Sequence, residues 1–325
     1  MKAVVITTPG GPEVLKLKEV DDPEVGDSEV LIKVDAAGVN RADTVQRKGL
    51  YPPPAGASPY PGLECSGTVI AVGQSVDRWK VGDEVCALLS GGGYAEKVAV
   101  SAGQVLPVPK GISLSYAASF PEVACTVWST VFMTSHLTSG ETFLIHGGSS
   151  GIGTFAIQIA KYYGVRVFVT AGSEEKLVTC KNLGADVGIN YKTEDFAARV
   201  KEETGGKGVD VILDIIGGPY FQRNLDSLSL DGRLFIIGFQ GGPITEVNLS
   251  GVLARRLTIQ GSGLRTRTPE NKAVIVAEVE KKVWPAIEAG NVKPVVYKTL
   301  PLSEAAEAHR IMESSAHIGK ILLIP

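Results

Sequence analysis

The chain has 325 residues, of which 44% are hydrophobic and 21% charged, a balance typical of a globular protein with room for two domains. Its formal net charge of -3 gives no general attraction to nucleic acid or to an anionic membrane surface. No apolar run approaches the roughly 20 residues of a membrane span, and no targeting segment is recognisable. We therefore expect a cytoplasmic protein by default. The four cysteines form no C-x-x-C pair, which favours reduced, buried thiols over a disulfide or a metal site.

The first 120 residues contain short stretches of strand composition separated by glycine and proline. These stretches lie at 14–20, 29–40, 66–73, 81–89 and 93–100. Short strands with turn signals and little helical periodicity predict a compact β-rich domain. The segment 40–62 is so rich in proline after Gly49 that no regular element can continue there, and loops of this length are usually functional or disordered.

From about Pro121 onward, helical and strand patterns alternate. Helices are predicted at 122–136, 173–184 and 193–203, and strands at 143–146, 165–169, 187–191, 209–216, 232–239 and 257–264. Such alternation predicts a parallel sheet covered by helices on both faces, which is the doubly wound α/β fold.

The C-terminal part begins with a long helical stretch at 269–290 and then returns to strand, helix and strand at 295–325. Its final apolar strand has no partner in the preceding alternation, so we expect it to fold back onto the N-terminal domain. The predicted division is therefore a β-rich domain of residues 1–122 and 291–325 and a doubly wound domain of residues 123–290.

The turn after the predicted strand at 143–146 carries a nucleotide-binding pattern. Residues Gly151-Ile152-Gly153-Thr154-Phe155-Ala156 match the G-x-G-x-x-A form of the dinucleotide fingerprint. The glycines permit a tight turn and a close approach to a pyrophosphate, and the helix that follows offers N–H groups and a positive dipole end. We expect this turn, with Gly148, to bind a dinucleotide.

The residues about 20 positions further on bear on the choice of dinucleotide. NAD-binding members of this fold place an acidic residue there, whereas this sequence has Thr170-Ala171-Gly172-Ser173. Ser173 and Lys176 could bind the additional phosphate of NADP, although a helix-capping serine and a solvated lysine are an equally simple interpretation. The missing acid favours NADPH over NADH and argues against a methyltransferase.

The order of motifs along the whole chain resembles the medium-chain dehydrogenase/reductase superfamily. These motifs are GVNRAD, PGLECSG, GDEV, GGGYAEKVAV, HGGSSGIG, TAGSEEK and HIGKILL. The segment NRAD-x-x-QR-x-G-x-Y and the TAGS turn with its lysine are most similar to the zinc-independent quinone oxidoreductase branch. The resemblance implies a Rossmann doubly wound parallel sheet with NADPH as cofactor, plus a β-rich, GroES-like N-terminal domain completed by the C-terminus.

The resemblance also bears on the reaction. Alcohol dehydrogenases of the superfamily hold a catalytic zinc ion through a cysteine in G-V-C-x-x-D and a histidine in G-H-E, where this sequence has Asn40 and Leu63. We therefore expect no metal. Without zinc as Lewis acid, alcohol oxidation is disfavoured, whereas a quinone accepts hydride without such activation. The resemblance implies hydride transfer from NADPH to an ortho-quinone-type acceptor.

Three residues are candidates for the chemical step. Tyr51 ends the segment that faces the nicotinamide in the resembled enzymes, and its phenol could donate to the acceptor oxygen. Asn40 begins the same segment, and its side-chain amide can both donate and accept a hydrogen bond. Ser150 lies in the glycine turn and is expected to contact the cofactor rather than to act as a nucleophile. A packed loop tyrosine and a turn asparagine are the structural alternatives.

Further cofactor contacts are expected around the sheet. The resemblance places Thr126 beside the nicotinamide and Tyr191 beside the 2′-phosphate. A strand end at the C-terminal edge of the sheet, where ligands bind in such folds, adds Gly238, Phe239 and Gln240. Arg265 follows the last strand and could reach the cofactor, with Arg267 an equal candidate. We interpret Asp43 and Glu64 as structural carboxylates, close in sequence to Arg41 and Arg47.

Two other functions remain open at this stage. The same hydride geometry serves a reductase of the double bond in enones or alkenals, and a non-catalytic NADPH-binding protein would share the fold. The expected partners are a small-molecule substrate and a second copy of the chain, because the strand near 257–264 could extend the sheet across a twofold axis.

Overall fold

The computed structural model describes residues 1–325, which form two compact units. The first unit comprises Met1–Cys125 and Leu264–Pro325, and the second comprises Thr126–Gly263. The sequence pattern predicts the later boundary near residue 290 instead. The structure differs because helix α9 (Pro269–Lys282) packs on η2 (Ala102–Gln104) and β7 (Val105–Pro107) of the first unit.

The first unit is built on a seven-stranded, mostly antiparallel sheet with the order β14-β15-β3-β4-β5-β7, to which β6 adds by pairing with β3. Alternate residues of the long strand β3, Val30, Ile32 and Val34, are buried in one core cluster, as a strand with one face on a core requires. β1 (Lys2–Ile6) and β2 (Leu15–Glu19) form a separate two-stranded antiparallel sheet. The other strands of the seven-stranded sheet are β3 (Glu29–Val39), β4 (Glu64–Val72), β5 (Glu84–Leu88), β6 (Lys97–Ser101), β14 (Val296–Pro301) and β15 (Lys320–Ile324).

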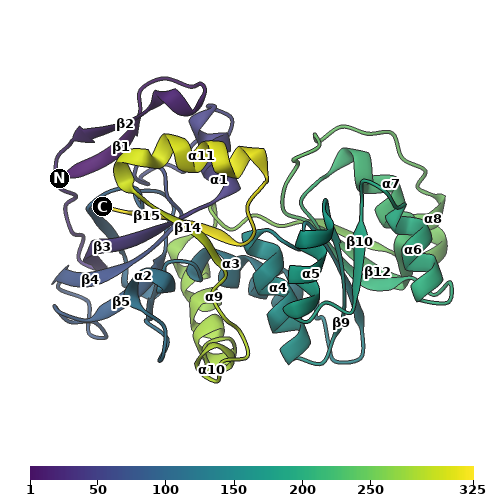
Figure 1. Ribbon diagram of the computed structural model, residues 1–325. Coiled ribbons are helices and arrows are strands. Elements are labelled where there is room, and N and C mark those ends of the chain that lie inside the picture. Colours follow the sequence, from purple (N-terminus) through teal and green to yellow (C-terminus); the bar gives the residue numbers. More distant parts are fainter. The chain divides into compact units, whose positions relative to one another are not determined.

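The C-terminal strand lies inside this sheet. β15 pairs antiparallel with β3 on one side and parallel with β14 on the other, so the strand left without a partner by the alternation finds one in the N-terminal region. Helix α11 (Ala305–Ser314) packs against α1 (Arg41–Arg47) and β2, and Figure 1 shows this yellow helix next to the purple N-terminal segment. The remaining helices of this unit are η1 (Pro12–Val14), α2 (Leu114–Ala117), α10 (Trp284–Glu288) and η4 (Leu302–Glu304).

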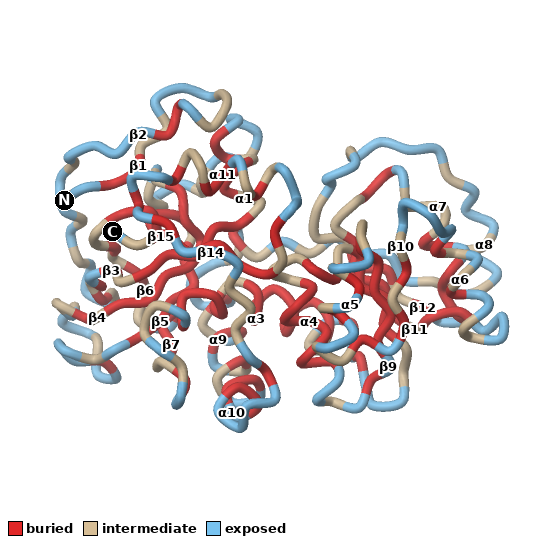
Figure 2. Tube along the Cα trace, in the orientation of Figure 1, coloured by how far each residue is buried: buried red, intermediate tan, exposed pale blue.

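The second unit contains a six-stranded parallel sheet with the order β10-β9-β8-β11-β12-β13. The strand order reverses between β8 and β11, and ligands of open parallel sheets bind beyond the strand ends at such a switch point. Figure 2 shows the central strands of this sheet mostly buried, whereas the edge strand β13 and helix α8 (Ser250–Arg255) are largely exposed. The strands are β8 (Thr142–His146), β9 (Arg166–Ala171), β10 (Val187–Asn190), β11 (Val209–Asp214), β12 (Leu228–Ile236) and β13 (Thr258–Gly261).

The helices of the second unit follow the strands in turn. They are α4 (Gly151–Tyr162), α5 (Glu174–Asn182), α6 (Phe196–Glu203), α7 (Gly218–Ser227) and α8 (Ser250–Arg255). The predicted helix at 122–136 is divided into α3 (Pro121–Val127) and a π-helix, η3 (Trp128–Thr134), in which the ring of Trp128 stacks on that of Phe132 at 4.6 Å. No helix in the structure is long and apolar enough to cross a membrane.

Candidate cofactor and acceptor site

The glycine turn of the second unit joins β8 to α4. Gly147 has φ +73°, a left-handed conformation that glycine adopts without strain. Ser150 is the N-cap of α4, and its Oγ accepts a hydrogen bond from Gly153 N at 3.0 Å. The hydroxyl proton of Ser150 is not used by this contact, so the side chain caps the helix and can still donate to a ligand.

Two glycines of this turn leave no room for a side chain. A Cβ on Gly148 would lie 2.6 Å from Val169 Cβ, and one on Gly153 would lie 2.4 Å from Gly147 O. Gly153 is therefore needed because α4 begins directly against the carbonyl groups of the turn. The sequence pattern suggested a different reason, the close approach of a pyrophosphate. The first N–H groups of α4 lack partners within the helix and can bind an anionic phosphate.

The end of β9 gathers a second set of polar groups. Ser173 caps α5 by accepting from Lys176 N at 3.4 Å. A Cβ on Gly172 would lie 2.6 Å from Tyr191 Oη and 3.2 Å from Lys192 Cε, so both side chains after β10 cover this glycine. Lys192 is not predicted from the sequence. Its signal was its place immediately after Tyr191, at the end of the strand next to β9.

The charges at this cluster suit a phosphate. Burial and the neighbouring charge of Lys192 lower the pKa of Lys176, with Glu175 acting in the opposite direction. The turn that follows β9 has no carboxylate until Glu174 at the start of α5. The segments after β9 and β10 thus supply two lysines and two hydroxyl groups, and a phosphate dianion near Lys176 and Lys192 would relieve the repulsion between them.

The remaining candidates of the second unit lie at other strand and helix ends. Gly238, Phe239 and Gln240 follow β12; Gln240 N donates to Ile215 O at 3.0 Å, and the Phe239 side chain is exposed. Asp214, at the end of β11, accepts from Ile216 N and Gly217 N, and burial raises its pKa to about 6. Thr126, the first residue of this unit, is buried in α3.

In the first unit, Asn40 is the N-cap of α1 and has no spare side-chain group. Its backbone N donates to Asp43 Oδ2 at 2.8 Å, and its Nδ2 donates to Glu64 Oε1 at 2.9 Å. Its Oδ1 accepts from Lys320 Nζ at 2.7 Å. The donor and the acceptor that made Asn40 a candidate are therefore both engaged inside the unit.

The carboxylates of Asp43 and Glu64 have structural partners. Glu64 is fully buried and forms an ion pair with Lys320 of β15 at 2.5 Å, while its second oxygen accepts from Glu122 N. Asp43 accepts from Gly62 N and Tyr94 Oη, and burial raises its pKa to about 6. The interpretation as structural carboxylates fits these contacts, but the partner of Glu64 is a lysine from the C-terminal strand rather than a nearby arginine.

Tyr51 lies in the loop after α1 and is partly buried. Burial raises the pKa of its phenol, the positive charge of Arg265 opposes this, and Glu122 adds to it. Arg265 is itself buried and donates to Tyr51 O, Ser90 O and Gln46 Oε1. This guanidinium was expected to contact the cofactor, whereas these three hydrogen bonds all lie within the first unit.

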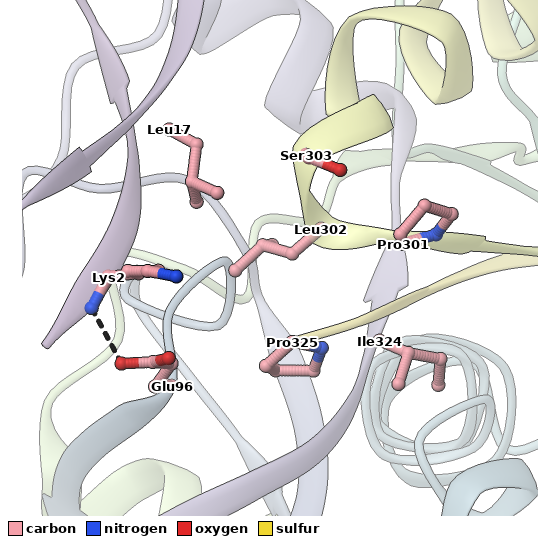
Figure 3. A pocket seen from close by; sticks show the side chains of 8 residues that line it. All are labelled: Lys2, Leu17, Glu96, Pro301, Leu302, Ser303, Ile324 and Pro325. Atoms are coloured by element: carbon pink, nitrogen blue, oxygen red, sulfur yellow. Dashed lines mark hydrogen bonds between the residues drawn. The ribbon is translucent and has the colours of Figure 1, made fainter.

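Two further observations concern other sites. No group of three or more histidine, cysteine, aspartate or glutamate side chains in the structure could hold a metal ion. A shallow pocket in the first unit lies beside the chain termini, where Lys2 N donates to Glu96 Oε2 (Figure 3). None of the predicted site residues lines that pocket, whose walls are Lys2, Leu17, Glu96, Pro301, Leu302, Ser303, Ile324 and Pro325.

Comparison with known proteins places the chain among the dehydrogenases with this two-part organisation. Residues 26–110 match the family model described as alcohol dehydrogenase GroES-like domain, and residues 151–280 match the one described as zinc-binding dehydrogenase. Quinone oxidoreductase of Rattus norvegicus is 35% identical over 328 residues, which is 100% of this chain and 98% of the relative.

Solved structures agree with this class. The Escherichia coli quinone oxidoreductase complexed with NADPH is 33% identical, with a TM-score of 0.90 and full coverage of both chains. A structure titled NAD-dependent alcohol dehydrogenase is 34% identical, with a TM-score of 0.87 and full coverage of both chains. The chain belongs to the quinone oxidoreductase family of the medium-chain dehydrogenase/reductase superfamily.

Proposed function

We propose that the chain is an NADPH-dependent reductase that transfers hydride to quinones without zinc. The observation that carries the proposal is that Tyr191 and Lys192 cover Gly172 after β9, and that the charge of Lys192 acts on Lys176. A carboxylate at this place would serve the ribose hydroxyls of NAD, whereas two lysines favour an additional phosphate. The relatives named quinone oxidoreductase, one of them complexed with NADPH, support the same assignment.

The second unit supplies the groups that would hold the cofactor. The turn from Gly148 to Gly153, with the Ser150 hydroxyl and the first N–H groups of α4, would bind the pyrophosphate. Ser173, Lys176, Tyr191 and Lys192 would bind the 2′-phosphate. We assign Thr126 and the segment 238–240 to the nicotinamide half. NADPH, when bound, supplies the hydride.

The first unit supplies the proposed proton donor. Tyr51 is assigned to protonate the acceptor oxygen on which negative charge develops, because its phenol is partly buried and beside a positive charge. Asn40 and Glu64 hold each other and Lys320 instead of a metal ion, and this supports the zinc-free assignment. Asn40 is thereby assigned to orientation of the loop rather than to proton transfer.

Initial rates with defined acceptors test the proposal. We expect kcat/KM for an ortho-quinone with NADPH to exceed that with NADH by more than tenfold, and to exceed that for an alkenal. Tyr51→Phe should lower kcat by about 10- to 100-fold while leaving the affinity for NADPH unchanged. An alkenal that outperforms every quinone would favour the double-bond reductase. NADPH binding without turnover of either class would favour a non-catalytic protein.

We also propose a homodimer. Strand β13 is at the edge of the parallel sheet, and all four of its residues are exposed. An unpaired strand edge can add a second copy of itself across a twofold axis. Sedimentation velocity should give twice the chain mass of 34.2 kDa, and a single species at the chain mass would refute this assignment.

A further inference from the structure

Arg265 joins three separate segments of the first unit. Its Nε donates to Ser90 O at 2.9 Å, just after β5, and one terminal nitrogen donates to Gln46 Oε1 of α1 at 2.7 Å. The other terminal nitrogen donates to Tyr51 O at 3.0 Å. With 4% of its surface exposed, the guanidinium is rigidly placed by these contacts.

The same guanidinium also contacts the aromatic ring of Tyr51. The central carbon of the Arg265 guanidinium lies 5.0 Å from the ring centroid, within the range of a cation–π contact. One side chain therefore fixes both the backbone and the ring of Tyr51. The phenol cannot turn away without breaking a contact with a buried charge.

A second buried cation lies behind Arg265. Lys272 of α9 is 2% exposed, and its Nζ donates to Arg265 O at 2.8 Å and to Ser90 Oγ. Neither cation forms an ion pair; their hydrogen-bond partners are carbonyl, amide and hydroxyl oxygens. Burial and the charge of Arg265 lower the pKa of Lys272 to about 8. The carboxylate whose charge acts on Arg265 is that of Asp43, which forms no ion pair with it. The field of the two buried positive charges favours a further negative charge nearby.

Tyr51 is the titratable group that this field reaches through direct contact. Burial has the largest effect and raises the pKa of the Tyr51 phenol, the charge of Arg265 lowers it, and the charge of Glu122 raises it. A phenol that gives up its proton becomes a phenolate, and burial alone would make this costly. The guanidinium over the ring reduces that cost because it is attracted to the phenolate more strongly than to the neutral ring.

We propose that Arg265 is a positioning residue that holds Tyr51 and stabilises the phenolate left after proton donation. This inference rests on the proposed function. In the reaction, the acceptor gains a hydride at carbon and an electron pair moves onto its oxygen. The Tyr51 O–H bond breaks, the proton bonds to that oxygen, and the phenol oxygen keeps the electron pair until water reprotonates it.

The direct test measures the acidity of Tyr51 itself. Site-specific incorporation of 3-fluorotyrosine at position 51 gives one ¹⁹F signal and lowers the pKa of the phenol, because fluorine withdraws electrons from the ring. In the full chain without substrate, Arg265→Met should raise the midpoint of this titration by about one pH unit. Arg265→Lys, which keeps the positive charge but not the planar guanidinium group, should raise the midpoint by less. The midpoint should not move in Arg267→Met, the matched control.

This measurement decides the inference without any activity. If folded Arg265→Met and Arg265→Lys proteins both titrate like the wild type, Arg265 does not act on the phenol and the inference is wrong. Circular dichroism identifies a variant that has not folded. In that case folded Arg265→Lys decides the inference, because it weakens the contact with the ring and should still raise the midpoint; an unchanged midpoint in Arg265→Lys would overturn the inference.

The catalytic test uses NADPH and an ortho-quinone. Arg265→Met should lower kcat by about tenfold in the wild-type background and by less than twofold when Tyr51 is already phenylalanine. Arg265→Lys should recover part of the loss. Equal losses in both backgrounds would mean that Arg265 acts independently of Tyr51. If the wild-type chain reduces no quinone, the proposed function fails, while the ¹⁹F titration still reports on the pairing of Arg265 with Tyr51.

Discussion

Lys176 and Lys192 bring two charges from different segments to the proposed phosphate site. Lys176 lies in the first turn of α5, and Lys192 follows β10. Burial and the charge of Lys192 lower the pKa of Lys176, so both disfavour the charged form of Lys176. A phosphate between them would replace this repulsion with two attractions, and an unphosphorylated ribose would not.

We expect Lys176→Ala and Lys192→Ala each to raise the KM for NADPH by about tenfold, since a charge-assisted hydrogen bond contributes roughly 1.5–3 kcal/mol. The KM for NADH should change by less than twofold. Lys161→Ala is the matched control, because Lys161 belongs to the same unit but pairs with Asp186. Equal losses with both cofactors would show that the lysines do not recognise the phosphate.

The sequence predicted some of these residues for a clear physical reason and missed others. Ser173 and Lys176 were visible because they follow the strand after the glycine turn at a fixed distance. Lys192 was not, because its place depends on β10 pairing with β9. Asn40 was expected to be available, but its partners Glu64 and Lys320 are 24 and 280 residues away in the chain. No local pattern predicts such contacts.

At the scale of elements, the ion pair between Glu64 and Lys320 fastens three strands where they meet. Asn40 follows β3, Glu64 begins β4 and Lys320 begins β15. The pair is nearly inaccessible to water, so neither charge can be left alone without a large desolvation penalty.

Lys320→Met should therefore destabilise the first unit by about 3–5 kcal/mol, because it leaves a carboxylate buried without its cation. Adding Glu64→Gln should recover much of the loss. Arg310→Gln removes the exposed pair with Glu307 in the same unit and should cost less than about 1 kcal/mol. Urea unfolding measures all three. A loss for Lys320→Met no larger than that for Arg310→Gln would contradict the importance of the pair.

The alternation of helices and strands predicted the parallel sheet because residue periodicity reports directly on local structure. It could not predict which core α9 joins, since an amphipathic helix fits more than one partner. The buried stripe of α9 also includes Lys272, which a pattern of apolar residues does not count. The change from α3 to the π-helix η3 could not be predicted from the sequence either, because both helical forms accept the same residues.

For the whole molecule, buried histidines and aspartates make opposite contributions to acid stability. Burial lowers the pKa of His146 to about 4 and that of His309 to about 3. Above about pH 6.5, the pKa of an unfolded histidine, these two residues do not reduce the stability of the native state. As the pH falls below about 6.5, the unfolded state binds more protons and the native state loses stability. Burial raises the pKa values of Asp43 and Asp214 to about 6, so their charged forms reduce the stability of the native state above pH 6. The penalty decreases as the pH falls below 6 because the native state then binds the protons.

The contribution of His146 can be isolated with His146→Gln. This ring is buried, with Nε2 2.7 Å from Asn224 Oδ1 and Nδ1 3.0 Å from Thr170 Oγ1. The stability difference between wild type and variant should be constant above pH 6.5 and should shrink by about 1.4 kcal/mol per pH unit from 6.5 towards 4. Amide exchange in β8 reports on the second unit alone. A difference that stays constant throughout would mean that His146 titrates normally.

The position of β15 in the first sheet has a consequence for how the protein is made. Synthesis runs from the N-terminus, so every residue of the second unit leaves the ribosome before β15 does, and that unit can fold while translation continues. The first unit cannot complete its sheet until β15 has been synthesised. Ala37–Val39 of β3, which lead directly into Asn40 and the Tyr51 loop, gain their β15 partner only from the last residues translated. A chain that ends near residue 310 would thus contain every strand of the parallel sheet, while Ala37–Val39 of β3 would still lack the strand that pairs with them.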